Sequence, residues 1–241
     1  KNFYKNESGC VISTTINKYI YLSMHEYFHQ GRYLLKYSKT ENIGSITEIK
    51  HKIIKEVFRI FDIKNVDFNS TADIPSGTGM GSSSAFTCGL INLCSNYNGI
   101  SLPNYEIARL ACEIEIDILN EPIGKQDQYG CAIGGLKLIK FNTDDSVEIK
   151  PIFLQQEKLK KLEDNLLLFY TNITREASTI LKEQEIKLSS PIVTSDEVER
   201  DYKLTKRELV PLIKAHKIPV IRINKRVLRF HRADIEQYLS A

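Results

Sequence analysis

Residues 75–85 read Pro75-Ser76-Gly77-Thr78-Gly79-Met80-Gly81-Ser82-Ser83-Ser84-Ala85, a row of alternate glycines that leads into three serines. The residues that follow, 86–94, space their large apolar side chains as a helix does. This order predicts bare backbone N–H groups at a helix start, where the helix dipole adds partial positive charge. Such a helix end favours an anion, most usefully a phosphate. The alternative is an ordinary turn in which Ser82 or Ser83 caps the helix.

The composition is that of a globular protein. The chain has 241 residues, of which 42% are hydrophobic and 26% charged, enough for one large domain or two smaller ones. No apolar run approaches the roughly 18 to 20 residues that a membrane span needs, and the first residues lack the apolar segment of a signal peptide. The five cysteines are scattered without metal-type spacing. We therefore expect a cytoplasmic protein with no membrane partner.

Charge divides the chain into two parts. Residues 185–241 hold 12 Lys+Arg against 8 Asp+Glu, whereas residues 1–184 hold 21 against 22. Such an asymmetry suggests two segments of different character. Residues 185–202 are polar and charged without an apolar stripe, so we predict that they form a linker.

Both helices and strands are predicted along the first part, which indicates an α+β fold. A helix capped by Thr47 would carry the apolar stripe of residues 49–61. The helix after the glycine loop would end at Asn98-Gly99, and Pro103 would open the next one. Alternating or apolar runs predict strands; these are residues 11–16, 19–22, 33–37, 66–71, 136–141 and 166–170.

Two carboxylates follow the glycine loop. Glu115 falls on the helix opened by Pro103, and Asp127 comes after the turn marked by Pro122 and Gly124. Phosphoryl transfer to an alcohol needs a metal ligand, a group that orients or deprotonates the hydroxyl, and donors around the phosphate. The two carboxylates supply the first two of these. The alternative is that both are surface carboxylates.

These motifs resemble those of a known family. Residues 75–85 resemble the second motif of the GHMP small-molecule kinases, and residues 123–129 resemble the catalytic-aspartate segment of the sugar kinases among them. Residues 15–19, 36–41 and 168–175 are similar to the D-glycero-D-manno-heptose 7-phosphate kinases. The resemblance covers about residues 1–184.

The resemblance implies ATP-dependent phosphorylation of a sugar or sugar phosphate, with Mg²⁺ as cofactor. It implies a GHMP-kinase-like N-terminal domain over residues 1–165. The ATP phosphates would lie on the glycine loop, formed by Gly77, Gly79, Met80, Gly81, Ser82, Ser83 and Ser84. Ser83 and Glu115 would hold Mg²⁺, and Asp127 would act on the acceptor hydroxyl. Lys18 and Lys125 are candidates for contacting an anionic sugar phosphate.

The family pattern also contains parts that this sequence lacks. The family has a Gly-Gly-Thr-Asp segment near its start, and the present sequence opens just after it. The family's second domain would begin at residues 166–184 and be truncated there. An open cleft excludes water poorly and positions substrate poorly. We therefore expect weak or absent kinase activity.

Residues 203–241 predict a small basic module. Thr205 and Glu208 have the spacing of a capping box, and residues 218–230 alternate apolar and basic side chains as a hairpin would. From Arg200 to Arg232 there are 11 basic and 2 acidic residues. The pattern resembles the excisionase-like winged helix-turn-helix modules, with only residues 211–217 left for a recognition helix. That resemblance implies DNA contacts from the wing, namely Arg222, Lys225, Arg226 and Arg229. The alternative is a solvated basic tail.

Three interpretations of the whole chain remain open. The first is a sugar-phosphate kinase or its remnant. The second is a DNA-binding protein that acts through its C-terminal module, with the kinase part as a scaffold. The third is a recombined reading frame without function.

Overall fold

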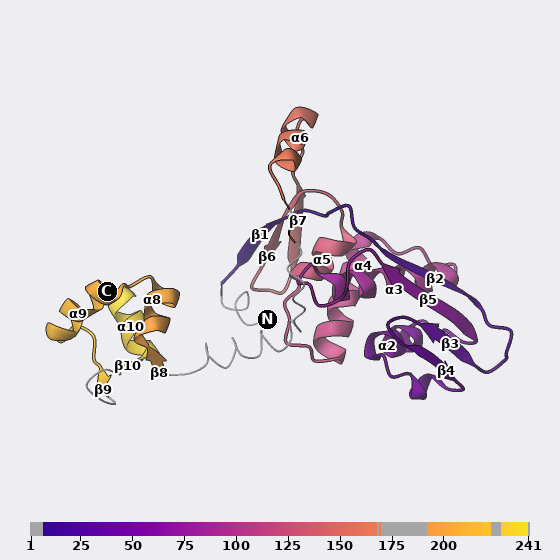
Figure 1. Ribbon diagram of the computed structural model, residues 1–241, viewed down its shortest axis with the longest axis horizontal. Helices are drawn as coiled ribbons and strands as arrows, with labels where there is room; N and C mark the ends of the chain where they lie inside the picture. Colours follow the sequence, from indigo (N-terminus) through magenta and orange to yellow (C-terminus); the bar gives the residue numbers. More distant parts are fainter. Residues whose placement is uncertain (1–6, 168, 170–191, 223–227, 241) are drawn as a thin grey trace. The chain divides into compact units, whose positions relative to one another are not determined.

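The protein divides into two compact units. The computed structural model describes residues 7–167, 169, 192–222 and 228–240. One unit spans Lys1–Leu181 and the other Lys182–Ala241 (Figure 1). Among the described residues, no helix combines the length and the apolar composition that crossing a membrane requires.

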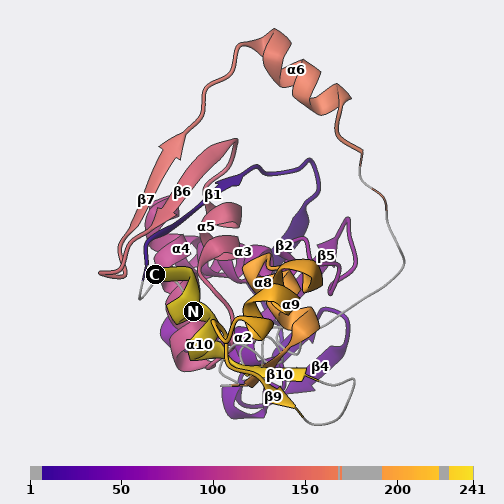
Figure 2. The ribbon, with the colours of Figure 1, turned by 90° about the vertical axis from the view of Figure 1, so that its left-hand side faces the viewer.

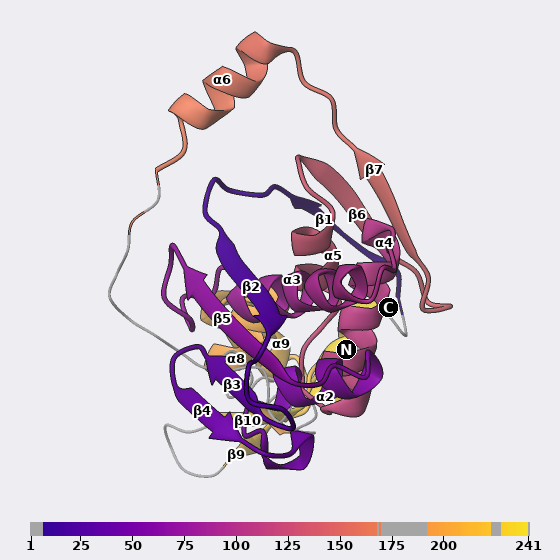
Figure 3. The ribbon, with the colours of Figure 1, turned by 90° about the vertical axis from the view of Figure 1, so that its right-hand side faces the viewer.

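The first unit contains two sheets. The larger has the order β2-β5-β3-β4, in which β3 and β5 run parallel and the other pairs antiparallel (Figure 3). The smaller has the antiparallel order β1-β6-β7 (Figure 2). The strands of the first unit are β1 (Gly9–Ser13), β2 (Ile20–Glu26), β3 (Tyr33–Lys36), β4 (Thr40–Ile43), β5 (Val66–Ala72), β6 (Lys137–Phe141) and β7 (Val147–Pro151).

The helix that follows the glycine loop occupies the centre of this unit. It contacts β2 and three other helices, and Leu90, Ile91 and Cys94 on it are fully buried. The unit's helices are η1 (Ile46–Glu48), α2 (Lys52–Ile60), α3 (Ser82–Tyr97), α4 (Asn104–Cys112), the π-helical turn η2 (Glu113–Ile118), α5 (Gln126–Ala132) and α6 (Gln156–Asp164). Burial of this apolar surface is the main force that fixes the arrangement of the helices.

Most predicted elements of the first part are present, with shifted ends. The strand predicted at 11–16 is β1, and it stops at Ser13, so that residues 14–16 form a connection instead. The predicted cap Thr47 is wrong, because Thr47 lies in the short turn η1. His51 caps α2 through Nδ1, which accepts from the backbone N–H of Ile54. The strand predicted at 166–170 and the segment 166–184 lie largely outside the described residues.

The second unit has its own apolar core. Its sheet has the antiparallel order β8-β10-β9. The elements are β8 (Ile192–Thr194), α8 (Ser195–Tyr202), α9 (Lys206–Lys214), β9 (Ile221–Arg222), β10 (Leu228–His231) and α10 (Arg232–Ser240). The core consists of Val193, Val198, Leu209, Ile218, Phe230 and Ile235.

The interpretation of residues 192–202 as linker is wrong, because they form β8 and α8 and bury Val193 and Val198. The predicted capping box at Thr205 is confirmed, and Thr194 forms a second one with Glu197. In each of these helices the N–H groups of the N-cap residue and of the third helical residue are hydrogen-bonded. Among the described residues of this unit, α9 is the second helix, after α8. It spans Lys206–Lys214, so the second helix is not limited to residues 211–217.

Candidate functional site

The glycine loop has a backbone that only glycine adopts easily. Gly77, Gly79 and Gly81 have φ angles of 76°, 75° and 72°, in the left-handed region that carries a steric penalty for other residues. Gly81 is the N-cap residue of α3, and no side chain bonds the first turn. The alternative in which Ser82 or Ser83 is the cap is therefore wrong. The N–H groups of the first turn of α3 are left without a side-chain cap, and they carry the positive end of a 16-residue helix dipole.

Helix α5 packs directly against this loop. A Cβ placed on Gly81 would lie 3.3 Å from Cys131 Sγ and 3.7 Å from both Cβ and Cγ of Asp127. Cys131 Sγ also donates to the carbonyl oxygen of Gly81 over 3.6 Å. The absence of a side chain at Gly81 is what lets the two segments approach so closely.

Glu115 is a buried carboxylate with several hydrogen-bond donors. It is 1% exposed. Its Oε1 accepts from the hydroxyls of Ser83 (3.1 Å) and Thr87 (2.8 Å), and its Oε2 accepts from Ser84 (3.0 Å) and the Gln128 amide. The carboxylate thus connects the start of α3, η2 and α5.

The oxygen donors of Ser83 and Glu115 suit Mg²⁺, which prefers hydroxyl, carboxylate and phosphate ligands. The Gln128 Oε1 atom, buried and without a hydrogen-bond partner among the described residues, lies on the side chain that bonds Glu115. No three His, Cys, Asp or Glu side chains form a metal cluster in the described part of the chain. The Ser83 hydroxyl and the Glu115 carboxylate together supply two oxygen ligands, which fit a metal that also binds phosphate.

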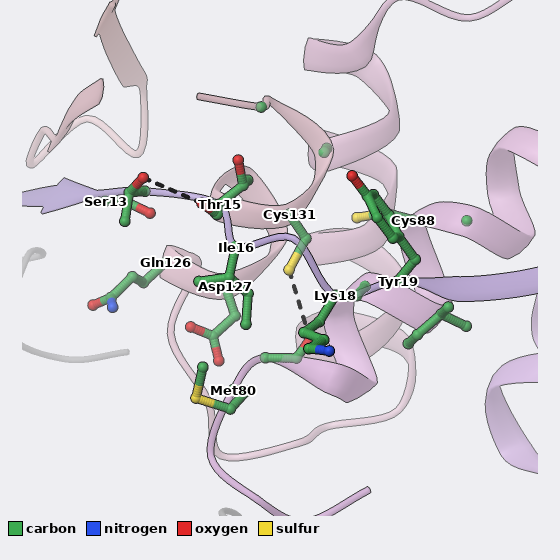
Figure 4. Close-up of a pocket in the computed structure, with 18 of the residues that line it drawn as sticks. Ser13, Thr15, Ile16, Lys18, Tyr19, Met80, Cys88, Gln126, Asp127 and Cys131 are labelled. Atoms are coloured by element: carbon green, nitrogen blue, oxygen red, sulfur yellow. Dashed lines mark hydrogen bonds between the residues drawn. The ribbon is translucent and has the colours of Figure 1, made fainter. Parts of the chain in front are cut away.

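Asp127 lies on the wall of a cavity of about 680 Å³. Figure 4 shows its carboxylate turned toward the space that the labelled residues surround. The carboxylate is accessible from the cavity, but surrounding protein atoms remove part of its hydration. This desolvation raises the pKa of Asp127 above its ordinary value of 3.8.

The cavity combines the glycine loop with segments from elsewhere in the chain. Loop residues Gly79, Met80 and Gly81 line one part of it. The other walls include hydroxyl and amide side chains, namely Ser13, Thr14, Thr15, Asn92, Asn104 and Gln126. Sequence reasoning did not single out any of these six. Residues 13–15 carried one usable signal, three successive hydroxyl side chains, but they fell within the strand predicted at 11–16.

The two candidate lysines lie in different surroundings. Lys18 lines the cavity and also a smaller neighbouring one, which Met80 and Ser82 line as well. Lys125 does not line either of these cavities, and its ammonium pairs with the Asp145 carboxylate over 2.7 Å. Of the two, the geometry brings only Lys18 to Asp127 and the glycine loop.

The candidate DNA contacts are described only in part. Lys225 and Arg226 lie outside the described residues, and of Arg222 only the backbone, in β9, is described. Arg229 lies in β10, where it is half-buried and donates to the carbonyl oxygen of Leu228 over 3.1 Å.

The first unit matches a known kinase family. Residues 48–135 match the family model described as "GHMP kinases N terminal domain". The matched residues include the glycine loop, Glu115 and Asp127.

The curated relatives of the chain include two sugar kinases. The chain is 30% identical over 194 residues to the D-glycero-alpha-D-manno-heptose 7-phosphate kinase of Campylobacter jejuni, covering 75% of this chain and 57% of the relative. It is 23% identical over 209 residues to the galactokinase of Thermotoga maritima, covering 80% and 59%. The chain therefore spans somewhat more than half the length of these curated relatives.

A solved structure supports the same fold. The D-glycero-D-manno-heptose 1-phosphate kinase from Bacteroides thetaiotaomicron aligns with a TM-score of 0.65 at 21% identity, covering 99% of this chain and 85% of that one. At this identity the likeness concerns the fold alone. It agrees with the mixed α/β, GHMP-kinase-like architecture of the first unit.

The close packing of Gly81 on α5 gives a testable difference between two glycines. Gly81→Ala and Gly99→Ala both put a Cβ at a positive φ, 72° and 74°, which costs roughly 1–2 kcal/mol. Of these two glycines, only Gly81 would place the added Cβ within 4 Å of neighbouring atoms. We therefore expect Gly81→Ala to lower the free energy of unfolding by about 1 kcal/mol more than Gly99→Ala, measured by urea denaturation. Equal losses would contradict the described contact between the loop and α5.

Proposed function

We propose that this protein transfers the γ-phosphoryl group of ATP to a hydroxyl group of a sugar or sugar phosphate. One observation carries the proposal. The glycine loop at the start of α3 and the Asp127 carboxylate line the same cavity, with α5 packed against Gly81. A donor site for phosphate and a group for the acceptor hydroxyl are thus adjacent, as phosphoryl transfer requires.

Each group in the site has a role in the transfer. The N–H groups of the loop and of the first turn of α3 would hold the ATP phosphates. Asp127 would accept the hydroxyl proton of the acceptor while the acceptor oxygen bonds to the γ-phosphorus and the bond to the β-phosphate oxygen breaks. When bound, Mg²⁺ neutralises charge on the phosphates. Ser83 and Glu115 would hold it, which requires the Ser83 hydroxyl to turn its hydrogen away from Glu115 Oε1.

We infer that the acceptor is a phosphorylated sugar. The chain's relatives include a heptose 7-phosphate kinase. Lys18 supplies a cation at the cavity, and the hydroxyl and amide side chains of residues 13–15, Asn92 and Asn104 can bond to sugar hydroxyls. The need for ATP is consistent with a cytoplasmic protein.

We propose DNA binding as a second function, located in the C-terminal unit. Helices α8 and α9 are joined by the three-residue turn 203–205, in which Lys203 has a φ of 59°. The antiparallel pair of β9 and β10 follows. A helix, a tight turn, a second helix and a hairpin are the parts of a winged helix-turn-helix. Exposed Arg207, Lys214 and Lys217 are cations suited to phosphate.

The role of Asp127 predicts a specific loss. Asp127→Asn should lower kcat by about 10²–10⁴-fold, because the amide cannot accept the proton, while thermal stabilisation by Mg·ATP persists. In the wild type, kcat/KM should fall as the pH drops through the raised pKa of Asp127, since only the ionised carboxylate accepts a proton. The control is Asp164→Asn, the same change at an exposed aspartate on α6. A pH-independent wild-type profile and an active Asp127→Asn would contradict the assignment.

The two lysines should differ in their effect on a phosphorylated acceptor. Lys18→Met should raise KM for the sugar phosphate by about 10–100-fold, the loss expected from one charged hydrogen bond. It should change KM for the unphosphorylated sugar little. Lys125→Met, which removes an equal charge outside the cavity, should leave both values unchanged. Steady-state kinetics with the two acceptors measures this, and equal effects of the two substitutions would refute the role of Lys18.

The second function predicts salt-dependent DNA affinity. Binding of the full chain to duplex DNA should weaken with rising salt, with a logarithmic slope of about −0.9 per phosphate contacted. Arg207→Ala on α9 should weaken binding and reduce the slope, whereas Lys158→Ala on α6 removes a cation from the first unit and should not. Fluorescence anisotropy at several salt concentrations decides the matter. Affinity that does not respond to salt, or that both variants lower alike, would count against the proposal.

A further inference from the structure

A lysine is buried at a position of β6 where the strand pattern calls for an apolar residue. Side chains alternate along β6, and Lys137, Ile139 and Phe141 all lie on its buried side. Lys137 is 1% exposed. Lys140 on the opposite side is exposed and pairs with Glu148. Burial of an amine costs free energy unless its N–H groups are hydrogen-bonded. The partners of the Lys137 amine therefore show what this position does in the fold.

The partners of Lys137 are two backbone carbonyls. Its Nζ donates to the carbonyl oxygen of Gly130 over 3.1 Å and to that of Gly135 over 3.2 Å. Desolvation lowers the pKa of Lys137, and even a neutral amine has two N–H groups for these two acceptors. Gly130 lies in the last turn of α5, where a cation also interacts favourably with the helix dipole.

One acceptor lines the candidate site, and the other is bonded to a residue that lines it. Gly130 lines the cavity, and a Cβ added there would lie 3.3 Å from the Ser13 hydroxyl. The N–H of Gly135 donates to Thr15 Oγ1 over 3.1 Å. Ser13 is also the register partner of Lys137 across β1 and β6. Lys137 therefore links the end of α5 to the hydroxyl-bearing segment 13–15.

Further hydrogen bonds join α5 to Glu115 and to the glycine loop. Gln128 donates to the buried Glu115, and Cys131 donates to the carbonyl of Gly81. Asp127 precedes Gln128 in the first turn of this seven-residue helix. A short helix has little stability of its own, so the direction of the Asp127 side chain depends on contacts at both ends of α5.

We propose that Lys137 is a positioning residue: its buried amine fixes α5 and residues 133–135 so that Asp127 and the hydroxyls of residues 13–15 face the same cavity. This inference rests on the proposed kinase function. Lys137 itself does not line the cavity. Its effect on the reaction is exerted through the helix that carries Asp127.

The test compares Lys137→Met and Lys137→Gln with Lys140→Met, the matched loss of a lysine from the exposed side of the same strand. Amide hydrogen exchange is measured over α5 and α3, and kcat and KM are measured with Mg·ATP and a sugar phosphate. We expect Lys137→Met to speed exchange in α5 about tenfold or more with α3 unchanged. We expect kcat to fall about 10–100-fold and KM for ATP to change less than twofold. Lys137→Gln should show the same pattern more weakly.

Two results would overturn the proposal. Wild-type exchange in α5 for both Lys137 variants would remove the positioning role, and equal acceleration in α3 and α5 would reduce Lys137 to a general contributor to stability. If Lys137→Met does not fold, Lys137→Gln decides by the same criteria. If the wild-type protein transfers no phosphate, the proposed function fails, and the exchange comparison still decides whether Lys137 fixes α5.

Discussion

The buried carboxylate of Glu115 is the interaction on which the first unit's site depends. Its two oxygens bind three hydroxyls of α3 and one amide of α5. Loss of this acceptor would leave buried donors unsatisfied, at about 1–3 kcal/mol each. The π-helical turn that carries Glu115 widens the helix locally, a device found often at functional sites. The start of α3 and the side of α5 are thereby held at a fixed separation.

Several features of the site follow from that separation. With α3 and α5 this close, even a Cβ on the residue that precedes α3 would crowd Cys131, and that residue is Gly81. Asp127 then lies at the edge of the loop rather than apart from it. The region that matches the GHMP kinase N-terminal domain model, residues 48–135, contains the loop, Glu115 and Asp127.

Local patterns predicted the parts of this structure that depend on neighbouring residues. The glycine loop, the start of α3 and the capping box at Thr205 are encoded within a few residues of one another, and the sequence revealed them. The sequence singled out Glu115 and Asp127 because the loop upstream supplied a context for two carboxylates, and their roles stay predictions. The fold class and the approximate strand positions followed from apolar spacing, which reports burial directly.

Contacts between distant residues could not be predicted in the same way. The role of Lys137 depends on carbonyls that only the folded chain brings to it, and its basic side chain resembles that of an exposed strand position. Residues 192–202 look like a linker because only Val193 and Val198 bury themselves there, too few to form a stripe. The cap of α2 is His51 and not Thr47, because the short turn η1 comes first and α2 begins only after it.

The hydrogen bond from the Cys131 thiol to the Gly81 carbonyl joins α5 to the glycine loop. Burial raises the pKa of this thiol to about 11, so that it keeps its proton at neutral pH and remains a donor. The Cys131 thiol is a weaker hydrogen-bond donor than an amide or an amine. Two such stronger donors also hold α5, the Gln128 amide, which bonds Glu115, and the Lys137 amine, which bonds the Gly130 carbonyl. The direct hydrogen bond from α5 to the glycine loop is therefore weaker than the bonds that tie α5 to Glu115 and to Lys137.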